Sequence, residues 1–190
     1  MFPTVVSLDP GGTTGWCVLC VHPLALVDPD LRVLDNVTYW RSGQYDGIEW
    51  EHVREIENLA AAWEGGAVVV EDFVLRRLSP ARELLSPVRL TAALEYVLWR
   101  EKRLVFRQSA SDAKTICTDE RLKDWGFYRR EGGEEHARDA TRHGLLFLRR
   151  ASTLDRRGAR LRRAAWPRLY DEKGAYAPEP PTPNGQEERP

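Results

Sequence analysis

The stretch Val5-Val6-Ser7-Leu8-Asp9-Pro10-Gly11-Gly12 places a carboxylate directly after a run of mostly apolar residues. The run predicts a buried strand over residues 4–8, and the glycines predict a turn into a returning strand over residues 16–21. A carboxylate at the end of a buried strand is costly unless another charge compensates it. Asp9 is therefore a candidate metal ligand. The same turn also fits a glycine-rich cradle for a phosphate, or a plain turn in which glycine supplies positive φ.

A second carboxylate follows a second apolar run, because Glu71 comes directly after Ala67-Val68-Val69-Val70. Neighbouring residues in a strand face opposite sides, so we expect Glu71 to point inward and Asp72 outward. The alternative is a strand end whose carboxylates are both solvated. An inward Glu71 would lie at an edge of the same predicted sheet as Asp9.

His136 and Asp139 are three residues apart in a helix predicted over residues 134–150, so they share one face of that helix. The helix also carries small residues that allow it to approach a sheet closely: Ala137, Ala140 and Gly144. An ordinary surface histidine with a nearby carboxylate is the alternative interpretation. If the helix packs on the sheet, His136 and Asp139 reach the strand ends.

Three carboxylates and one imidazole favour a hard divalent cation over zinc, because such cations prefer oxygen ligands. The predicted ligands are Asp9, Glu71, His136 and Asp139, and the expected cofactor is Mg²⁺ or Mn²⁺, with two ions per site. Two ions about 4 Å apart can activate water and stabilise a leaving oxygen in phosphodiester hydrolysis. Lys114 is a candidate for neutralising a phosphate beside them, or an ordinary surface lysine.

The predicted elements follow the order β-β-β-α-β-α-β-α. This order predicts an α/β fold with a five-stranded mixed sheet, three antiparallel strands and then two parallel, and helices on both faces. We expect a third strand over residues 32–41, a helix capped by Asp46, and a loop over residues 118–133. A nuclease domain would span residues 1–150, followed by a basic extension over 151–169 and a disordered, Pro-rich acidic tail over 170–190.

The chain has 190 residues, a net charge of −1 and three cysteines, so one domain with buried, reduced thiols is expected. No apolar segment approaches the ~20 residues of a membrane span, and no signal peptide is recognisable. We therefore expect a cytoplasmic protein, in the host cytosol if it is phage-encoded, with no membrane partner. Between Arg142 and Arg168 nine arginines stand against one acid, Asp155. This run predicts either a track for nucleic acid or a solvated helix face.

The order and spacing of these pieces resemble the RuvC family of Holliday-junction resolvases, within the ribonuclease H-like superfamily. The resemblance spans about residues 5–150 and implies a ribonuclease H-like fold with metal ligands at Asp9, Glu71 and Asp139. Some members of that family carry a histidine at the place of His136. It also implies that Lys114 lies near the scissile phosphate, that Lys123 matches a second lysine, and that the protein is a homodimer.

The predicted function is a metal-dependent endonuclease that resolves four-way or other branched DNA junctions. The predicted catalytic residues are Asp9, Glu71, His136, Asp139 and Lys114. The predicted DNA contacts are Phe73, Arg76, Arg77, Lys114 and Lys123, with Phe73 placed beside Glu71 as a wedge. The alternatives are a nuclease of this fold acting on RNA–DNA hybrids or flaps, an actin- or Hsp70-like phosphate-binding domain, and a DNA-binding protein without catalysis.

Overall fold

A five-stranded sheet forms the centre of the molecule. The computed structural model describes residues 2–73, 86–129 and 134–178. The strands are β1 (Thr4–Asp9), β2 (Thr13–Val21), β3 (Val37–Asp46), β4 (Ala67–Asp72) and β5 (Val105–Ser109), in the order β3-β2-β1-β4-β5. β1, β2 and β3 pair antiparallel, whereas β1–β4 and β4–β5 pair parallel. The predicted fold class is confirmed.

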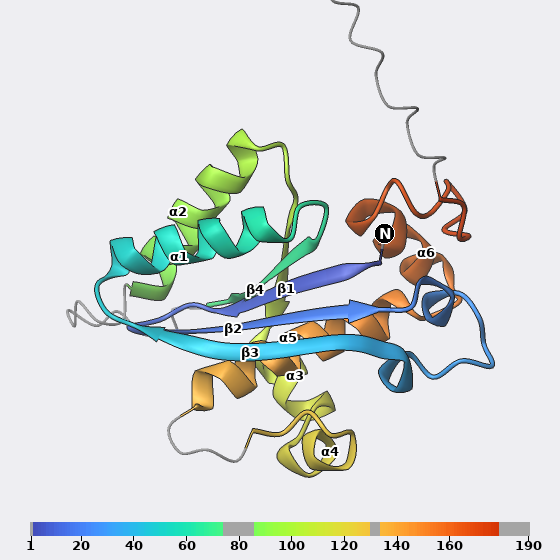
Figure 1. The fold of residues 1–190 in the computed structure, drawn as a ribbon, viewed down its shortest axis with the longest axis horizontal. Coiled ribbons are helices and arrows are strands. Elements are labelled where there is room, and N and C mark those ends of the chain that lie inside the picture. The colour runs from blue at the N-terminus through green and yellow to red at the C-terminus, as the bar shows by residue number, and fades with distance from the viewer. Residues whose placement is uncertain (1, 74–85, 130–133, 179–190) are drawn as a thin grey trace, which may run out of the picture.

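Helices cover both faces of this sheet (Figure 1). α1 (Glu49–Ala62) and α2 (Ser86–Arg100) pack on one face, and α5 (Glu135–Ala151) packs across the other. The remaining helices lie around α5 or in connections: α3 (Ala110–Ile116), α4 (Asp119–Asp124), α6 (Arg156–Ala165) and the 3₁₀ turns η1 (Pro23–Leu26) and η2 (Val33–Asn36). The sheet is therefore the middle layer of three.

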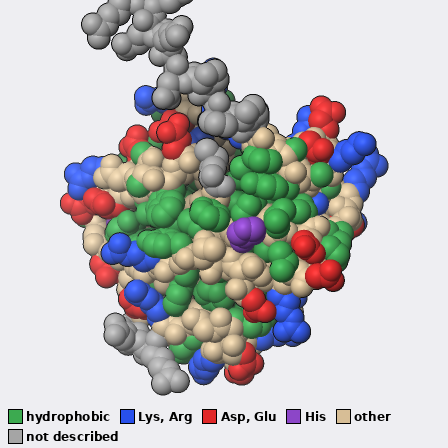
Figure 2. Space-filling model, turned by 45° about the vertical axis from the view of Figure 1, so that its right-hand side comes forward, with side chains coloured by type: hydrophobic (Ala, Val, Ile, Leu, Met, Phe, Trp, Pro, Cys, Tyr) green, Lys and Arg blue, Asp and Glu red, His purple; other side chains and the backbone are tan. Residues whose placement is uncertain are grey.

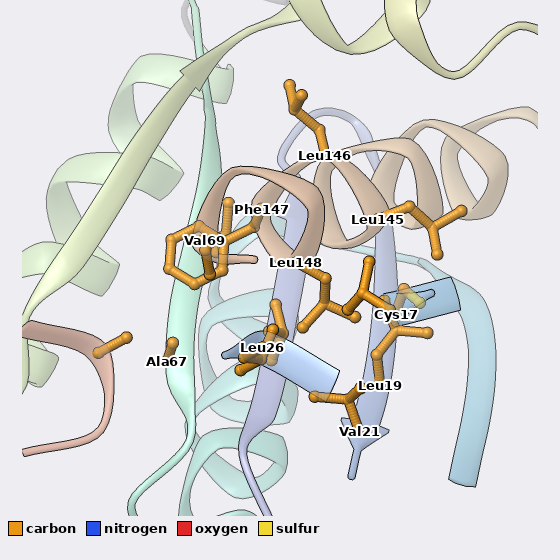
Figure 3. Packing of buried hydrophobic residues seen from close by; sticks show 14 of the residues in the cluster. Cys17, Leu19, Val21, Leu26, Ala67, Val69, Leu145, Leu146, Phe147 and Leu148 are labelled. Carbon is orange, nitrogen blue, oxygen red and sulfur yellow. The ribbon is translucent and has the colours of Figure 1, made fainter. Parts of the chain in front are cut away.

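Strand alternation divides the interior into two cores. Val5 and Val69 belong to the core under α5, whereas Val6, Val68 and Val70 belong to the core under α1 and α2. Figure 3 shows the first of these cores, in which α5 leucines and Phe147 meet side chains of β2 and β4. Because successive side chains point to opposite faces, odd positions of both β1 and β4 face α5.

α5 lies unusually close to the sheet at two glycines. A Cβ atom on Gly15 would lie 1.9 Å from the backbone oxygen of His136, and one on Gly144 would lie 2.7 Å from Ser7 Oγ. Ser7 Oγ donates a 2.7 Å hydrogen bond to the Ala140 carbonyl. Ala137 and Ala140 are both 0 % exposed. The prediction that small residues bring this helix onto the sheet is confirmed.

Three local expectations are wrong. Residues 33–36 form the 3₁₀ turn η2, so the third strand begins at Val37 and continues to Asp46. Asp46 does not cap α1, because its carboxylate accepts a hydrogen bond from Thr13 Oγ1 across the β2–β3 pair. The expected loop over 118–133 contains α4, whose N-cap Thr118 accepts from the Arg121 amide.

The segment after α5 packs on the same core as the sheet. Trp166 and Tyr170 are 3 % and 2 % exposed, and their polar atoms donate to the carbonyls of Thr4 and Pro23. An isolated bridge pairs Tyr170 with Tyr176. Core contacts therefore continue past residues 150 and 170, so the predicted boundaries at these two residues do not coincide with the end of the packed core. Residues 179–190 lie outside the described part of the chain.

Figure 2 turns the right-hand side of Figure 1, where α6 lies, toward the viewer. Figure 2 shows hydrophobic side chains gathered near the centre of that view, with Lys, Arg, Asp and Glu mainly around its margin.

Cys17, Cys20 and Cys117 are free and buried, as expected for reduced thiols. In the described ranges no helix is both long enough and apolar enough to cross a bilayer.

The contact between Gly15 and α5 predicts that Gly15→Ala destabilises the fold. The added methyl group would collide with the His136 backbone, so the helix must move, and overpacking of this kind costs about 1–3 kcal/mol. Gly12→Ala is the matched control, because a Cβ on Gly12 meets no atom within 4 Å. Chemical denaturation measures both. Equal stabilities for the two variants would contradict this account of the α5–sheet contact.

Candidate active site

Asp9 is the last residue of β1 and Glu71 the next-to-last residue of the neighbouring parallel strand β4, on the same side of the sheet. Leu8 is paired with Val70 in the β1–β4 register, and each carboxylate is the next residue along its strand. Both occupy odd positions, so both side chains face α5. Asp72 points the other way and pairs with Arg107, 3.1 Å away. The inward position of Glu71 and the outward position of Asp72 are confirmed.

The first turn of α5 brings His136 onto Asp9. His136 Nδ1 lies 2.7 Å from Asp9 Oδ2, although the two residues are 127 positions apart. Burial raises the pKa of Asp9 above its ordinary value; the bond from His136 opposes this shift, and the charges of Glu71 and Asp139 reinforce it. The hydrogen bond with Asp9 raises the pKa of His136. These couplings place the three predicted carboxylates within one electrostatic cluster.

Asp139 is held by two cations. Lys114 Nζ lies 2.9 Å from Asp139 Oδ2, and the buried Arg142 pairs with the other carboxylate oxygen. The bond with Asp139 raises the pKa of Lys114, and the charges of Glu71 and Asp9 act in the same direction. The side chain of Lys114 is 58 % exposed, so it lies at the mouth of the cluster and remains accessible from solvent.

Arg142 has a structural role that the sequence analysis missed. It belongs to the basic run of residues 142–168, but its side chain is 11 % exposed and also pairs with Asp119 at the start of α4. Its Nε donates to the Cys117 carbonyl over 3.0 Å. Its spacing of three residues from Asp139 on a helix was the available signal. Arg142 therefore fixes Asp139 relative to the segment joining α3 and α4.

His143 is the second residue that the sequence analysis missed. Its imidazole is 1 % exposed, with Nε2 3.0 Å from Glu71 Oε2 and Nδ1 3.3 Å from Gln108 Oε1. Glu71 and Gln108 are register partners on β4 and β5. His143 lies four residues after Asp139 on the same helix face, so helical spacing could have identified it. It holds Glu71 from the side of α5.

The donor set suits a hard divalent cation. Asp9, Glu71 and Asp139 offer carboxylate oxygens, and burial, reinforced by the charges of Glu71 and Asp139, raises the pKa of Asp9. Each carboxylate has its own positive or imidazole partner in this structure. Among residues 2–73, 86–129 and 134–178, no three His, Cys, Asp or Glu side chains are grouped so as to hold a metal ion. Ion binding would therefore require these carboxylates to exchange partners.

A hollow of about 620 Å³ adjoins the cluster between α3, α4 and α5. Its lining includes Lys114, His136, Arg138, Asp139 and Arg142. The lining also includes the carboxylates of Asp119, Glu120 and Glu135, so the hollow brings acidic as well as basic groups to the edge of the cluster.

Of the remaining predicted DNA contacts, the structure describes Phe73 and Lys123. Phe73 follows β4 directly, two residues after Glu71, and is half-buried. Lys123 is exposed on α4, with Nζ 4.7 Å from the centre of the Tyr128 ring; no contact with the carboxylates is found in the described residues. Arg76 and Arg77 lie outside the described residues. DNA binding by all four stays a prediction.

The Asp9–His136 pair predicts a histidine that titrates above its ordinary range. In metal-free protein, NMR titration should give His136 a raised pKa, and Asp9→Asn should lower it because the charged partner is lost. A raised pKa means that the folded state holds the proton more tightly. The pair therefore contributes stability below the ordinary histidine pKa, and that stability is lost as pH rises through the raised value.

Asp72→Asn is the control for this titration, since Asp72 is exposed and pairs with Arg107 on the opposite face. It should leave the His136 titration unchanged. The same midpoint for His136 in wild type and in Asp9→Asn would show that the pair does not form in solution.

Comparison with solved structures identifies a similar fold. A T. thermophilus RuvC in complex with a Holliday junction substrate is 16 % identical, with a TM-score of 0.56 over 75 % of this chain and 90 % of that one. A second Thermus thermophilus RuvC structure is 15 % identical, with a TM-score of 0.52 over 78 % and 93 %. No protein-family model and no curated protein matches the sequence. The chain therefore has a RuvC-like, ribonuclease H-like fold.

Proposed function

We propose that this protein is a divalent-metal-dependent endonuclease that hydrolyses phosphodiester bonds in branched DNA. The observation that carries the proposal is the meeting of Asp9, Glu71 and Asp139, with His136 and Lys114, at one edge of the sheet. Such a concentration of buried and partly buried carboxylates is costly to a fold, which favours a functional reason for it. The similarity of the fold to a RuvC bound to a Holliday junction supports the choice of substrate.

The ions, Mg²⁺ or Mn²⁺, would be held by Asp9, Glu71 and Asp139, with His136 as a further ligand or as a group that positions water. When bound, they would lower the pKa of water and offset charge on the leaving oxygen. Lys114 would turn from Asp139 toward the scissile phosphate, because its side chain is already exposed at the mouth of the cluster. His136 would be oriented through Nδ1 by Asp9.

Junction cleavage requires two nicks, so we propose a homodimer in which each subunit cuts one strand. A cytoplasmic location is part of the same proposal. Nucleases of this fold that cut hybrids or flaps share the chemistry of the cluster. The choice between these substrates must therefore come from a substrate panel.

Neighbouring carboxylates on β4 provide the sharpest test of the active site. Glu71→Gln should reduce cleavage of a synthetic four-way junction in Mg²⁺ or Mn²⁺ by at least about 100-fold. Loss of a mere supporting partner of a metal ligand already costs about 10–100-fold. Asp72→Asn is adjacent, exposed and on the other face, so its rate should stay close to that of wild type.

The same assay should include a linear duplex, an RNA–DNA hybrid and a flap of matched sequence. Preference for the junction supports the proposed substrate, and preference for the hybrid or flap would replace it. Undiminished cleavage by Glu71→Gln on every substrate would remove the site assignment.

The contact between His143 and Glu71 predicts a positioning role in the same reaction. His143→Leu removes the hydrogen bond by replacing the imidazole with an apolar group of similar size. Cleavage should then fall by about 10–100-fold. His143→Gln retains an N–H donor and should recover part of that loss. Junction binding in chelator should be similar for both variants and wild type. A wild-type cleavage rate in His143→Leu would show that Glu71 does not need this partner.

A further inference from the structure

The exposed arginines of α6 form a basic face that the candidate active site does not use. Arg156, Arg157, Arg160 and Arg163 are exposed, and no acidic residue lies within the helix. Arg162 belongs to the same run but is 4 % exposed, and it donates to the carbonyls of Gly174 and Thr153. The structure thus separates a structural arginine from arginines that are free to meet a ligand.

Three of these four arginines, Arg156, Arg160 and Arg163, follow helical spacing. Positions 156, 160 and 163 are related as i, i+4 and i+7, so they form one stripe about 10 Å long. Within the described residues, Arg156 and Arg160 form no ion pair with a carboxylate. Arg163 has one exposed pair, 3.2 Å from Glu172. Exposed pairs of this kind contribute little energy, so the stripe carries positive charge that is largely uncompensated.

The helix that carries this stripe is firmly fixed. Asp155 caps it by accepting from the Gly158 amide over 2.9 Å, and Ala165 and Trp166 are buried in the α5-side core. A rigid support reduces the entropy lost when the arginines bind an extended polyanion.

The stripe lies far from the carboxylates. α5 has 17 residues and is about 25 Å long, with His136 and Asp139 in its first two turns and α6 following its other end. Figure 1 shows α6 at the end of the sheet opposite the start of α5. A polyanion on α6 therefore occupies a second place on the molecule.

We propose that Arg156, Arg160 and Arg163 form a second contact for the DNA phosphate backbone, remote from the cutting site. The geometry suits a duplex, because a length of 10 Å along one strand spans several phosphates. An anionic membrane surface fits less well, since a membrane-binding helix must insert its apolar face, and here that face is buried in the core. The choice of DNA rests on the proposed function; the basic contact itself does not.

The test is duplex binding in chelator as a function of salt, by fluorescence anisotropy. The variant is Arg156→Gln/Arg160→Gln/Arg163→Gln. The control is Arg32→Gln/Arg54→Gln/Arg100→Gln, which removes three exposed arginines from other elements. Three lost phosphate contacts should reduce the slope of log K against log salt by about 2.7. Raising the salt from about 50 to about 200 mM should then weaken DNA binding by the variant about 40-fold less than binding by wild type. The control variant should respond to salt nearly as wild type does.

Equal slopes for the variant and the control, with both proteins folded by circular dichroism, would overturn the proposal. So would a variant that loses binding to phosphatidylserine vesicles but keeps the wild-type slope on DNA. A wild-type protein that binds duplex through these arginines but cuts no substrate would refute the proposed function and leave this inference standing. Conversely, junction cleavage by the wild-type protein together with an unchanged salt slope in the variant would support the proposed function and refute this inference.

Discussion

The close contact between α5 and the sheet is the constraint on which the candidate site depends. Gly15, Ala137 and Gly144 leave no room for larger side chains at the contact, and Ser7 bonds directly to the α5 backbone. His136 lies at this contact, and Asp139 follows one turn later. A sub-ångström displacement of α5 would alter the distance from His136 to Asp9 and from His143 to Glu71. Packing thus sets the geometry of groups that the chain sequence keeps far apart.

The electrostatics of the cluster follow from this packing. Three carboxylates meet where two strands end, and the protein balances them with His136, His143, Lys114 and Arg142. Burial, reinforced by the charges of Glu71 and Asp139, nevertheless raises the pKa of Asp9. Energetic cost concentrated at one edge of an otherwise well-packed sheet is typical of a site under selection for chemistry. Arg142 and His143 restrain the ligands from behind, and Lys114 stays at the surface.

The C-terminal part of the chain shows why a composition argument is insufficient. The arginine content of residues 142–168 predicted a nucleic-acid track or a solvated helix face, yet Arg142 and Arg162 are buried, and Trp166 and Tyr170 join the core. The same stretch presents a stripe of exposed arginines at the end remote from the carboxylates. The arginines of this stretch therefore have two physical roles. Some donate hydrogen bonds to buried backbone carbonyls, and others place positive charge at the surface. On α6, the role of an arginine depends on the face of the helix on which it lies, and the packing of α6 on the core decides which face is buried.

By itself the sequence determined the strands that carry Asp9 and Glu71 near their ends, the helix that carries His136 and Asp139, and the class of the sheet. These follow from local periodicity, from strand alternation and from small residues on one helix face. Tertiary structure decided which partner each carboxylate has, because Asp9 and His136 are 127 positions apart and nothing local specifies their contact. It also decided the roles of His143 and Arg142, the formation of α4 from a polar segment, and the inclusion of residues 156–176 in the fold. Each of these depends on contacts between distant segments, and sequence spacing carries no direct measure of such contacts.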